Sequence, residues 1–170
     1  RFTDGDWKAK KQHGHWTQWG LANNDVGDLF WITNTNPMES PYLHPKYWDT
    51  VKRLAGKEIR GVPIDMGKPY DPGFLSVKSL CLLNDRGGPA AEVRSFTSAC
   101  GQTVYRGHKF PLEDYGDYFL CGPTIHVVRR ANMSKKSGLD FLEKTEPGDS
   151  EFLRSSDINS RFINTATGPD

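Results

Sequence analysis

The chain has 170 residues, of which 36% are hydrophobic and 12% aromatic, which is enough for one folded domain and too apolar for a disordered chain. Lysine plus arginine (22) nearly cancel aspartate plus glutamate (21), so no global field would attract nucleic acid or an anionic membrane, and nucleic-acid binding is not expected. A run of about 18 apolar residues is absent, which excludes a membrane-spanning helix.

The N-terminal region, residues 1–26, is polar and carries Trp7, Trp16 and Trp19 among hydrophilic neighbours. This pattern predicts an extended arm or strand pair that aromatic anchors fasten to the core. Residues 27–33 (GDLFWIT) are strongly apolar and are bounded by polar residues, which is typical of a buried strand.

The hydrophobic period changes after this strand. The apolar residues near Pro45 recur at helical spacing and are Tyr47, Trp48, Val51, Leu54 and Ala55. Pro45 suits a first helical turn, and Gly56 is placed to end the helix. The sequence therefore predicts one helix near 45–55.

Short β segments dominate the middle of the chain. Residues 58–64 alternate polar and apolar, and Pro63 favours a sheet edge. Residues 74–83 form the most apolar stretch and predict a central strand. Residues 91–99 and 102–110 predict a hairpin that turns at Cys100-Gly101, and a second hairpin follows with its turn at Gly122-Pro123.

Residues 133–170 form a polar C-terminal region in which parts are expected to be mobile. Within it, short apolar groups predict two helical turns, at 139–142 and 152–153. Residues 1–170 are thus predicted to form a single α+β domain. We expect a mainly antiparallel sheet of about five to seven short strands with one helix packed near 45–55.

Trp16 and Trp19 stand just before Asn23, Asn24 and Asp25. Aromatic faces beside amides and a carboxylate suit a sugar, whose C–H faces stack on rings while its hydroxyls bind planar polar groups. Packing of the arm on the core explains the two tryptophans equally well. The Asn and Asp cluster also suits calcium, although a simple turn is the favoured interpretation.

A divalent metal is the cofactor that the histidine pattern would hold. His13 and His15 are two residues apart, so in an extended segment both rings point the same way, and Asp28 is a candidate third ligand. Histidines in a polar arm more often face solvent, and that alternative is favoured. The sequence has no HExxH, CxxC or EF-hand pattern.

Arg129 and Arg130 precede Lys135 and Lys136, a basic cluster that would attract sulfated polysaccharide or phosphate. An ordinary solvated face is the alternative. His126, inside an apolar strand, and His108 are candidates for a general base, but no nucleophile motif accompanies them.

Cys81, Cys100 and Cys121 allow at most one internal disulfide. Asn132 begins an Asn-Met-Ser sequence, which fits the N-glycosylation pattern. Together with the high tryptophan content, these features favour an extracellular or secreted protein. The chain begins with Arg1 rather than Met, and we expect that a preceding segment was removed.

The sequence as a whole predicts an extracellular recognition module that binds a glycan or a protein partner. Loops on a rigid sheet commonly carry recognition, and no assembled catalytic motif is visible. A small hydrolase, with or without metal, is one alternative. A structural or assembly subunit, which would form an oligomer, is another.

Overall fold

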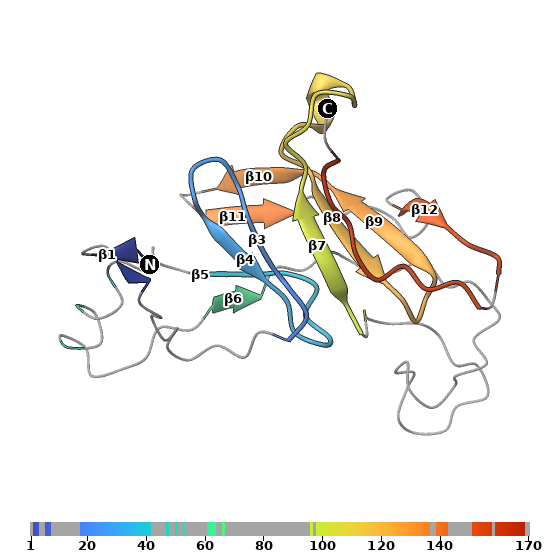
Figure 1. Cartoon of the computed structure of the whole chain (residues 1–170), viewed down its shortest axis with the longest axis horizontal. Coiled ribbons are helices and arrows are strands. Elements are labelled where there is room, and N and C mark those ends of the chain that lie inside the picture. Colours follow the sequence, from blue (N-terminus) through green and yellow to red (C-terminus); the bar gives the residue numbers. More distant parts are fainter. Residues whose placement is uncertain are drawn as a thin grey trace.

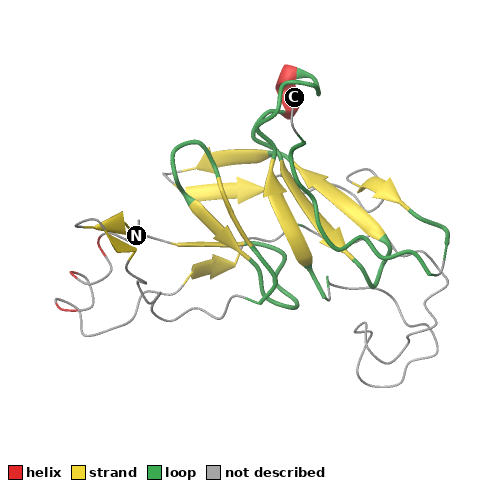
Figure 2. Cartoon of the chain, in the orientation of Figure 1, coloured by secondary structure: helices red, strands yellow, loops and turns green. Residues whose placement is uncertain are grey.

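The computed structural model describes residues 2–3, 6–7, 18–41, 47, 50, 53, 61–63, 66, 96, 98–136, 139–142, 151–157 and 159–168. Every strand pair within these residues is antiparallel. Figure 2 shows that strands and the loops between them make up most of the described chain. They group into two four-stranded sheets and two two-stranded ribbons (Figure 1).

The first sheet has the order β3-β4-β5-β6 and the second has the order β12-β9-β8-β7. The strands of the first are β3 (Leu21–Asn23), β4 (Leu29–Trp31), β5 (Glu39–Pro41) and β6 (Gly61–Pro63). Those of the second are β7 (Cys100–Val104), β8 (Tyr118–Gly122), β9 (Val127–Ala131) and β12 (Glu151–Arg154). The ribbons pair β1 (Phe2–Thr3) with β2 (Asp6–Trp7), and β10 (Met133–Lys136) with β11 (Leu139–Leu142).

The strand predicted within 27–33 is confirmed as β4. Trp31 is 0% exposed, and its indole Nε1 donates to Glu39 Oε2 at 2.9 Å, so the ring is buried with its polar atom satisfied. The edge position that Pro63 predicts is also confirmed, because β6 ends the order of its sheet. A proline at an edge leaves no ladder hydrogen bond unmade inside the sheet.

The hairpin predicted around Gly122-Pro123 is confirmed as β8 and β9. Its register pairs Tyr118 with Ala131 and Gly122 with Val127. The turn ends at His126, whose φ of 59° is in the left-handed region that residues other than glycine seldom adopt.

The hairpin turn predicted at Cys100-Gly101 is wrong, because both residues lie inside β7. The register between β7 and β8 shifts between Cys100 and Thr103, and Gly101 has a φ of 58°. A glycine with positive φ serves a β-bulge as well as a turn, so composition could not separate the two.

The predicted α+β class is wrong as well. The described residues are β-rich and contain no helix of seven or more residues, so a packed helix is absent from them. The helical element with described bounds is the 3-10 helix η2 (Leu112–Asp114). Of the helix predicted near 45–55, most lies outside the described residues. A pattern of about three turns has little intrinsic helix stability without tertiary support. No helix in the described parts is long and apolar enough to cross a membrane.

The two helical turns predicted in the C-terminal region are also wrong. Residues 139–142 form β11, and residues 152–153 lie inside β12. Apolar groups of two or three residues do not distinguish the helical period from the strand period, and pairing to a neighbouring strand decides the outcome here.

The main core lies between the two four-stranded sheets. It contains Phe30 and Ile32 from the first sheet's side and Tyr118 and Leu120 from β8, with the rings of Phe30 and Tyr118 6.4 Å apart. Because side chains alternate along a strand, Phe119 and Cys121 of β8 point to the opposite face of the second sheet. Those residues belong to a second apolar cluster with Tyr105 and Val128.

Candidate functional site

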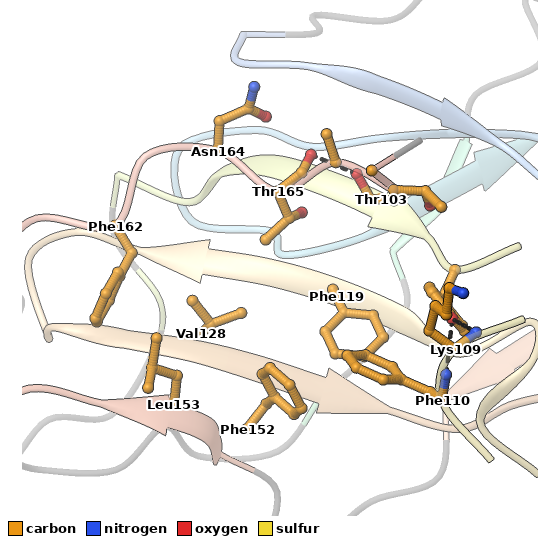
Figure 3. Close-up of a pocket in the computed structure, with 14 residues that line it drawn as sticks. Thr103, Lys109, Phe110, Phe119, Val128, Phe152, Leu153, Phe162, Asn164 and Thr165 are labelled. Carbon is orange, nitrogen blue, oxygen red and sulfur yellow. Dashed lines mark hydrogen bonds between the residues drawn. The ribbon is translucent and has the colours of Figure 1, made fainter. Parts of the chain in front are cut away.

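A groove opens over this second cluster, on the face of the β12-β9-β8-β7 sheet that faces away from the first sheet (Figure 3). Its cavity has a volume of about 480 Å³, within the range of small-molecule and peptide side-chain sites. Five aromatic rings line it, those of Tyr105, Phe110, Phe119, Phe152 and Phe162.

The floor is formed by Phe119 and Val128, which come from adjacent strands. Each is 6% exposed, so neighbouring side chains cover most of both surfaces. β8 consists of apolar residues on both of its faces, and all of them are buried. One face packs in the main core, and the other provides Phe119 for the floor.

Two rings form the rim above this floor. Phe110 is 38% exposed and Phe152 is 51% exposed, and their centroids are 5.6 Å apart. Phe152 also meets Phe119 edge to face, at 5.2 Å and an interplanar angle of 88°. Aromatic pairs prefer such offset and edge arrangements, so packing against the floor favours these orientations of the rim rings.

An irregularity in β12 explains why two consecutive residues of a strand line the groove. Glu151 pairs with Arg129 and Leu153 pairs with Val128, with a register shift between Glu151 and Leu153. In a regular strand Phe152 and Leu153 would point to opposite faces, but a bulge places neighbours on the same side. Both therefore contribute to the groove wall.

The loop that carries Lys109 and Phe110 is fastened to Tyr105. The Tyr105 hydroxyl accepts hydrogen bonds from the backbone N–H groups of Lys109 and Phe110, each at 3.0 Å. Gly107 allows this close approach, since a Cβ there would lie 2.6 Å from the same hydroxyl oxygen. Lys109 and Phe110 thus sit at one end of the groove, with Phe162 at the other (Figure 3).

The opposite wall is the C-terminal segment 164–168, which runs beside β7 (Figure 1). The backbone N–H of Thr165 donates to the Gly101 carbonyl at 3.0 Å, and its hydroxyl donates to the same oxygen at 2.6 Å. The Thr103 hydroxyl donates to the Thr165 carbonyl at 2.7 Å. The bulge at Gly101 frees the carbonyl that holds this wall in place.

A buried ion pair fixes β12 to β9. Arg129 Nη2 is 2.5 Å from Glu151 Oε1, and both side chains are 0% exposed. Arg129 Nη1 donates to the Met66 carbonyl at 2.8 Å, and the guanidinium carbon lies 5.1 Å from the centre of the Phe96 ring. Since Glu151 immediately precedes Phe152, this pair positions the groove wall from below.

The predicted ligand-binding residues Trp19, Asn23, Asn24 and Asp25 do not line the groove. Trp19 is 59% exposed, whereas Trp16 lies outside the described residues. The Asn24 side chain accepts from the Asp28 backbone N–H at 2.9 Å, which is the geometry of the β3-β4 turn.

Asp25, at the tip of this turn, contacts the second sheet's loops. Its carboxylate accepts from the Tyr115 hydroxyl at 2.6 Å and lies 3.7 Å from Arg106. That hydrogen bond is the main cause that raises the pKa of Tyr115. The tip therefore serves as a contact between loops.

The predicted metal ligands are not brought together by the described residues. His13 and His15 lie outside them, so the metal prediction stays a prediction. The Asp28 carboxylate accepts from the Asn24 side-chain amide at 3.0 Å. Within the described parts of the chain, no group of three or more His, Cys, Asp or Glu could hold a metal ion.

The predicted basic cluster is split by the sheet. Arg129 points inward to the ion pair described above, so it is not part of a surface cluster. Arg130 points outward and pairs with Asp114 at 2.5 Å and with Asp117 at 3.3 Å. Asn132, the predicted glycosylation site, is exposed between β9 and β10.

The candidate general bases are also separated. His108 is exposed, whereas His126 is 3% exposed. His126 Nδ1 is 3.0 Å from the Asp157 carbonyl oxygen, and Arg161 Nη1 is 3.2 Å from its Nε2. These contacts hold the turn between β8 and β9 against the segment after β12.

The groove itself was not found from the sequence. Its rings come from segments up to 57 positions apart, Tyr105 and Phe162 being the extremes. One signal was available, because the segment Tyr118-Phe119-Leu120-Cys121 is apolar at every position. Such a run predicts a strand that is covered on both faces.

Of the comparisons of the chain with known proteins, the family models gave a match. No curated protein and no solved structure matches it. A family model described as "Domain of unknown function (DUF7133)" matches residues 1–170. The match covers the whole chain, which therefore belongs to the DUF7133 family.

Proposed function

We propose that this chain is a recognition domain that binds an extended, apolar and acidic segment of a partner protein in the aromatic groove. The observation that carries the proposal is the pair of exposed rings, Phe110 and Phe152, above a preformed apolar floor. Large apolar side chains that gather at a concave surface mark interaction sites, whereas singly scattered ones do not.

The chemistry of the lining favours a polypeptide over a sugar. Phenylalanine, valine and leucine supply six of its fourteen described lining residues, and this lining offers one carboxamide, that of Asn164, and no carboxylate. Sugar hydroxyls require several planar polar partners, whereas apolar side chains of a protein require contact area. The groove supplies the second.

The charge and the shape of the groove further restrict which polypeptide segments it could bind. Lys109 is the one charged side chain among the described residues that line the groove, so the site carries a positive charge. An acidic residue of the partner would complement it. The two walls, β12 and residues 164–168, both run along the sheet, and an extended segment can lie between them.

The expected contribution of the rim can be estimated from burial. Phe152 is half exposed, and covering the rest of its ring is worth about 1 to 2 kcal/mol. Removing the ring should therefore weaken binding by about 5- to 30-fold. The floor residues are already packed in the free protein, so binding should cost little side-chain conformational entropy there.

The test uses two fluorescein-labelled decapeptides in which phenylalanine or leucine alternates with aspartate in one and with lysine in the other. Anisotropy titration should show saturable binding of the acidic peptide that Phe152→Ala weakens by about 5- to 30-fold. Leu112→Ala is the matched control, because Leu112 is 86% exposed and lies outside the groove. It should leave the affinity unchanged.

Equal binding of both peptides by the wild-type chain and by the Phe152 variant would overturn the proposal. Glycan recognition is tested separately, by titration of a labelled neutral oligosaccharide in place of the peptides. Saturable binding of a neutral oligosaccharide that is lost in Trp19→Ala would favour the sugar site predicted around Trp19.

An extracellular location is part of the proposal, and the exposure of Asn132 supports it. The hydrolase and the structural subunit stay predictions.

A further inference from the structure

Two of the three cysteines lie opposite each other in the second sheet. Cys100 begins β7, Cys121 lies in β8, and the two are register partners. Directly opposite residues of an antiparallel pair have Cα atoms about 4.5 to 5.5 Å apart and side chains on the same face. Disulfides require Cα atoms about 4.4 to 6.8 Å apart, so register alone brings this pair within range.

Both thiols are free in the structure, and they lie beside each other at the second apolar cluster. Cys121 is 0% exposed in the cluster beneath the groove, and Cys100 packs against the same cluster. Burial raises the pKa of Cys100, while burial and the neighbouring Cys100 raise the pKa of Cys121 to about 12. Neutral buried thiols are poor nucleophiles and poor metal ligands.

We propose that Cys100 and Cys121 form a disulfide when the chain folds in an oxidising compartment. Two S–H bonds break and one S–S bond forms, so two electrons and two protons leave the protein. A small-molecule disulfide such as oxidised glutathione accepts them and becomes two thiols. Because the folded pair is buried and neutral, exchange takes place before the sheet closes over it.

The disulfide would join β7 to β8 next to the point where the hydrogen-bonded register between these two strands is interrupted. Within the register shift between Cys100 and Thr103, the Gly101 N–H donates to the Trp19 carbonyl at 3.3 Å, and its carbonyl accepts from Thr165. Gly101 therefore bonds to segments other than β8. A covalent link at Cys100 would fasten this end of β7 directly to β8, under the floor of the groove.

The full chain is refolded in a glutathione buffer that contains both oxidised and reduced forms, denatured, alkylated without reductant and analysed by intact mass and peptide mapping. One alkylated thiol is expected, at Cys81, together with a linked peptide pair that contains Cys100 and Cys121. Reduction should add two alkylation sites and lower Tm by roughly 5 °C or more.

Cys81→Ser provides the matched control, and it should keep the linked pair. Cys100→Ser should instead leave Cys121 open to alkylation after denaturation. The mapping of the wild-type chain is decisive even where a variant fails to fold. Three alkylated thiols after refolding, or a linked pair that includes Cys81, would overturn the assignment.

Discussion

Replacing Glu151 by glutamine should destabilise the chain strongly, because it leaves the charge of Arg129 inside the protein. The two side chains are 0% exposed and 2.5 Å apart. With charge centres about 4 Å apart and an effective dielectric constant of about 20, their attraction is worth about 4 kcal/mol. Removal of one partner from a buried pair costs about 3 to 5 kcal/mol.

The remaining contacts of Arg129 set where in that range the loss should fall. The Met66 carbonyl still accepts a hydrogen bond at 2.8 Å, and the Phe96 ring still faces the guanidinium at 5.1 Å. Both stabilise the positive charge in part. We therefore expect a loss of about 3 kcal/mol, which lowers Tm by about 6 to 12 °C in a chain of this length.

Urea denaturation followed by circular dichroism measures the loss. The control is Arg106→Gln, since Arg106 and Asp25 are 3.7 Å apart with side chains 45% and 53% exposed. That change should cost less than about 1 kcal/mol. The double variant R129M/E151L carries no buried charge and should recover most of the lost stability.

The reasoning would be refuted if Glu151→Gln lost no more stability than Arg106→Gln. It would also be refuted if R129M/E151L were less stable than the single Glu151 variant. Either result would mean that the pair is solvated in solution, and that β12 is held to the sheet by other contacts.

Three further predictions concern a glycine contact, a buried thiol and an exposed sequence motif. Gly107→Ala should cost about 1 to 3 kcal/mol in urea denaturation, because its Cβ would meet Tyr105, while Gly168→Ala, with open space around it, should be neutral. In the reduced protein, the raised pKa of Cys121 means that the unfolded thiol ionises first, so stability should fall from about pH 9 upward toward pH 12, and Cys121→Val should flatten that fall. Expression through a secretory pathway should yield a glycan that peptide N-glycosidase removes and that Asn132→Gln abolishes, and an unchanged mass after digestion of the secreted wild type would contradict the site.

The β8-β9 hairpin was predictable because its signals agree. Gly122-Pro123 interrupts two runs rich in β-branched and aromatic residues, and local turn chemistry and strand propensity lead to the same structure. Gly101 was not predictable in the same way, because its positive φ is shared by turns and bulges. The pairing of Thr103 with Phe119 on the neighbouring strand shows that β7 continues through the bulge at Gly101 instead of turning back.

The candidate site was harder to predict than the fold. The predicted sites relied on residues close in sequence, such as Asn23, Asn24 and Asp25, whose side chains are used in the turn itself and in contacts with Tyr115. The groove is assembled from residues that strand pairing brings together, and Phe152 reaches it only through a register shift. Neither the strand pairing nor the register shift can be predicted from the spacing of residues in the sequence.

The position of β12 links the stability of the chain to the proposed binding site. This strand is at the edge of its sheet, and its register is irregular. Besides its pairing with β9, the contacts that hold it include the ion pair of Glu151 and the backbone N–H of Ser155, which donates to the His126 carbonyl at 3.0 Å. An edge strand opens at lower free energy than the core strands beneath it. A change that weakens either contact should therefore reduce peptide binding before it unfolds the β8-β9 hairpin, and hydrogen exchange at Phe152 should increase ahead of exchange in the core.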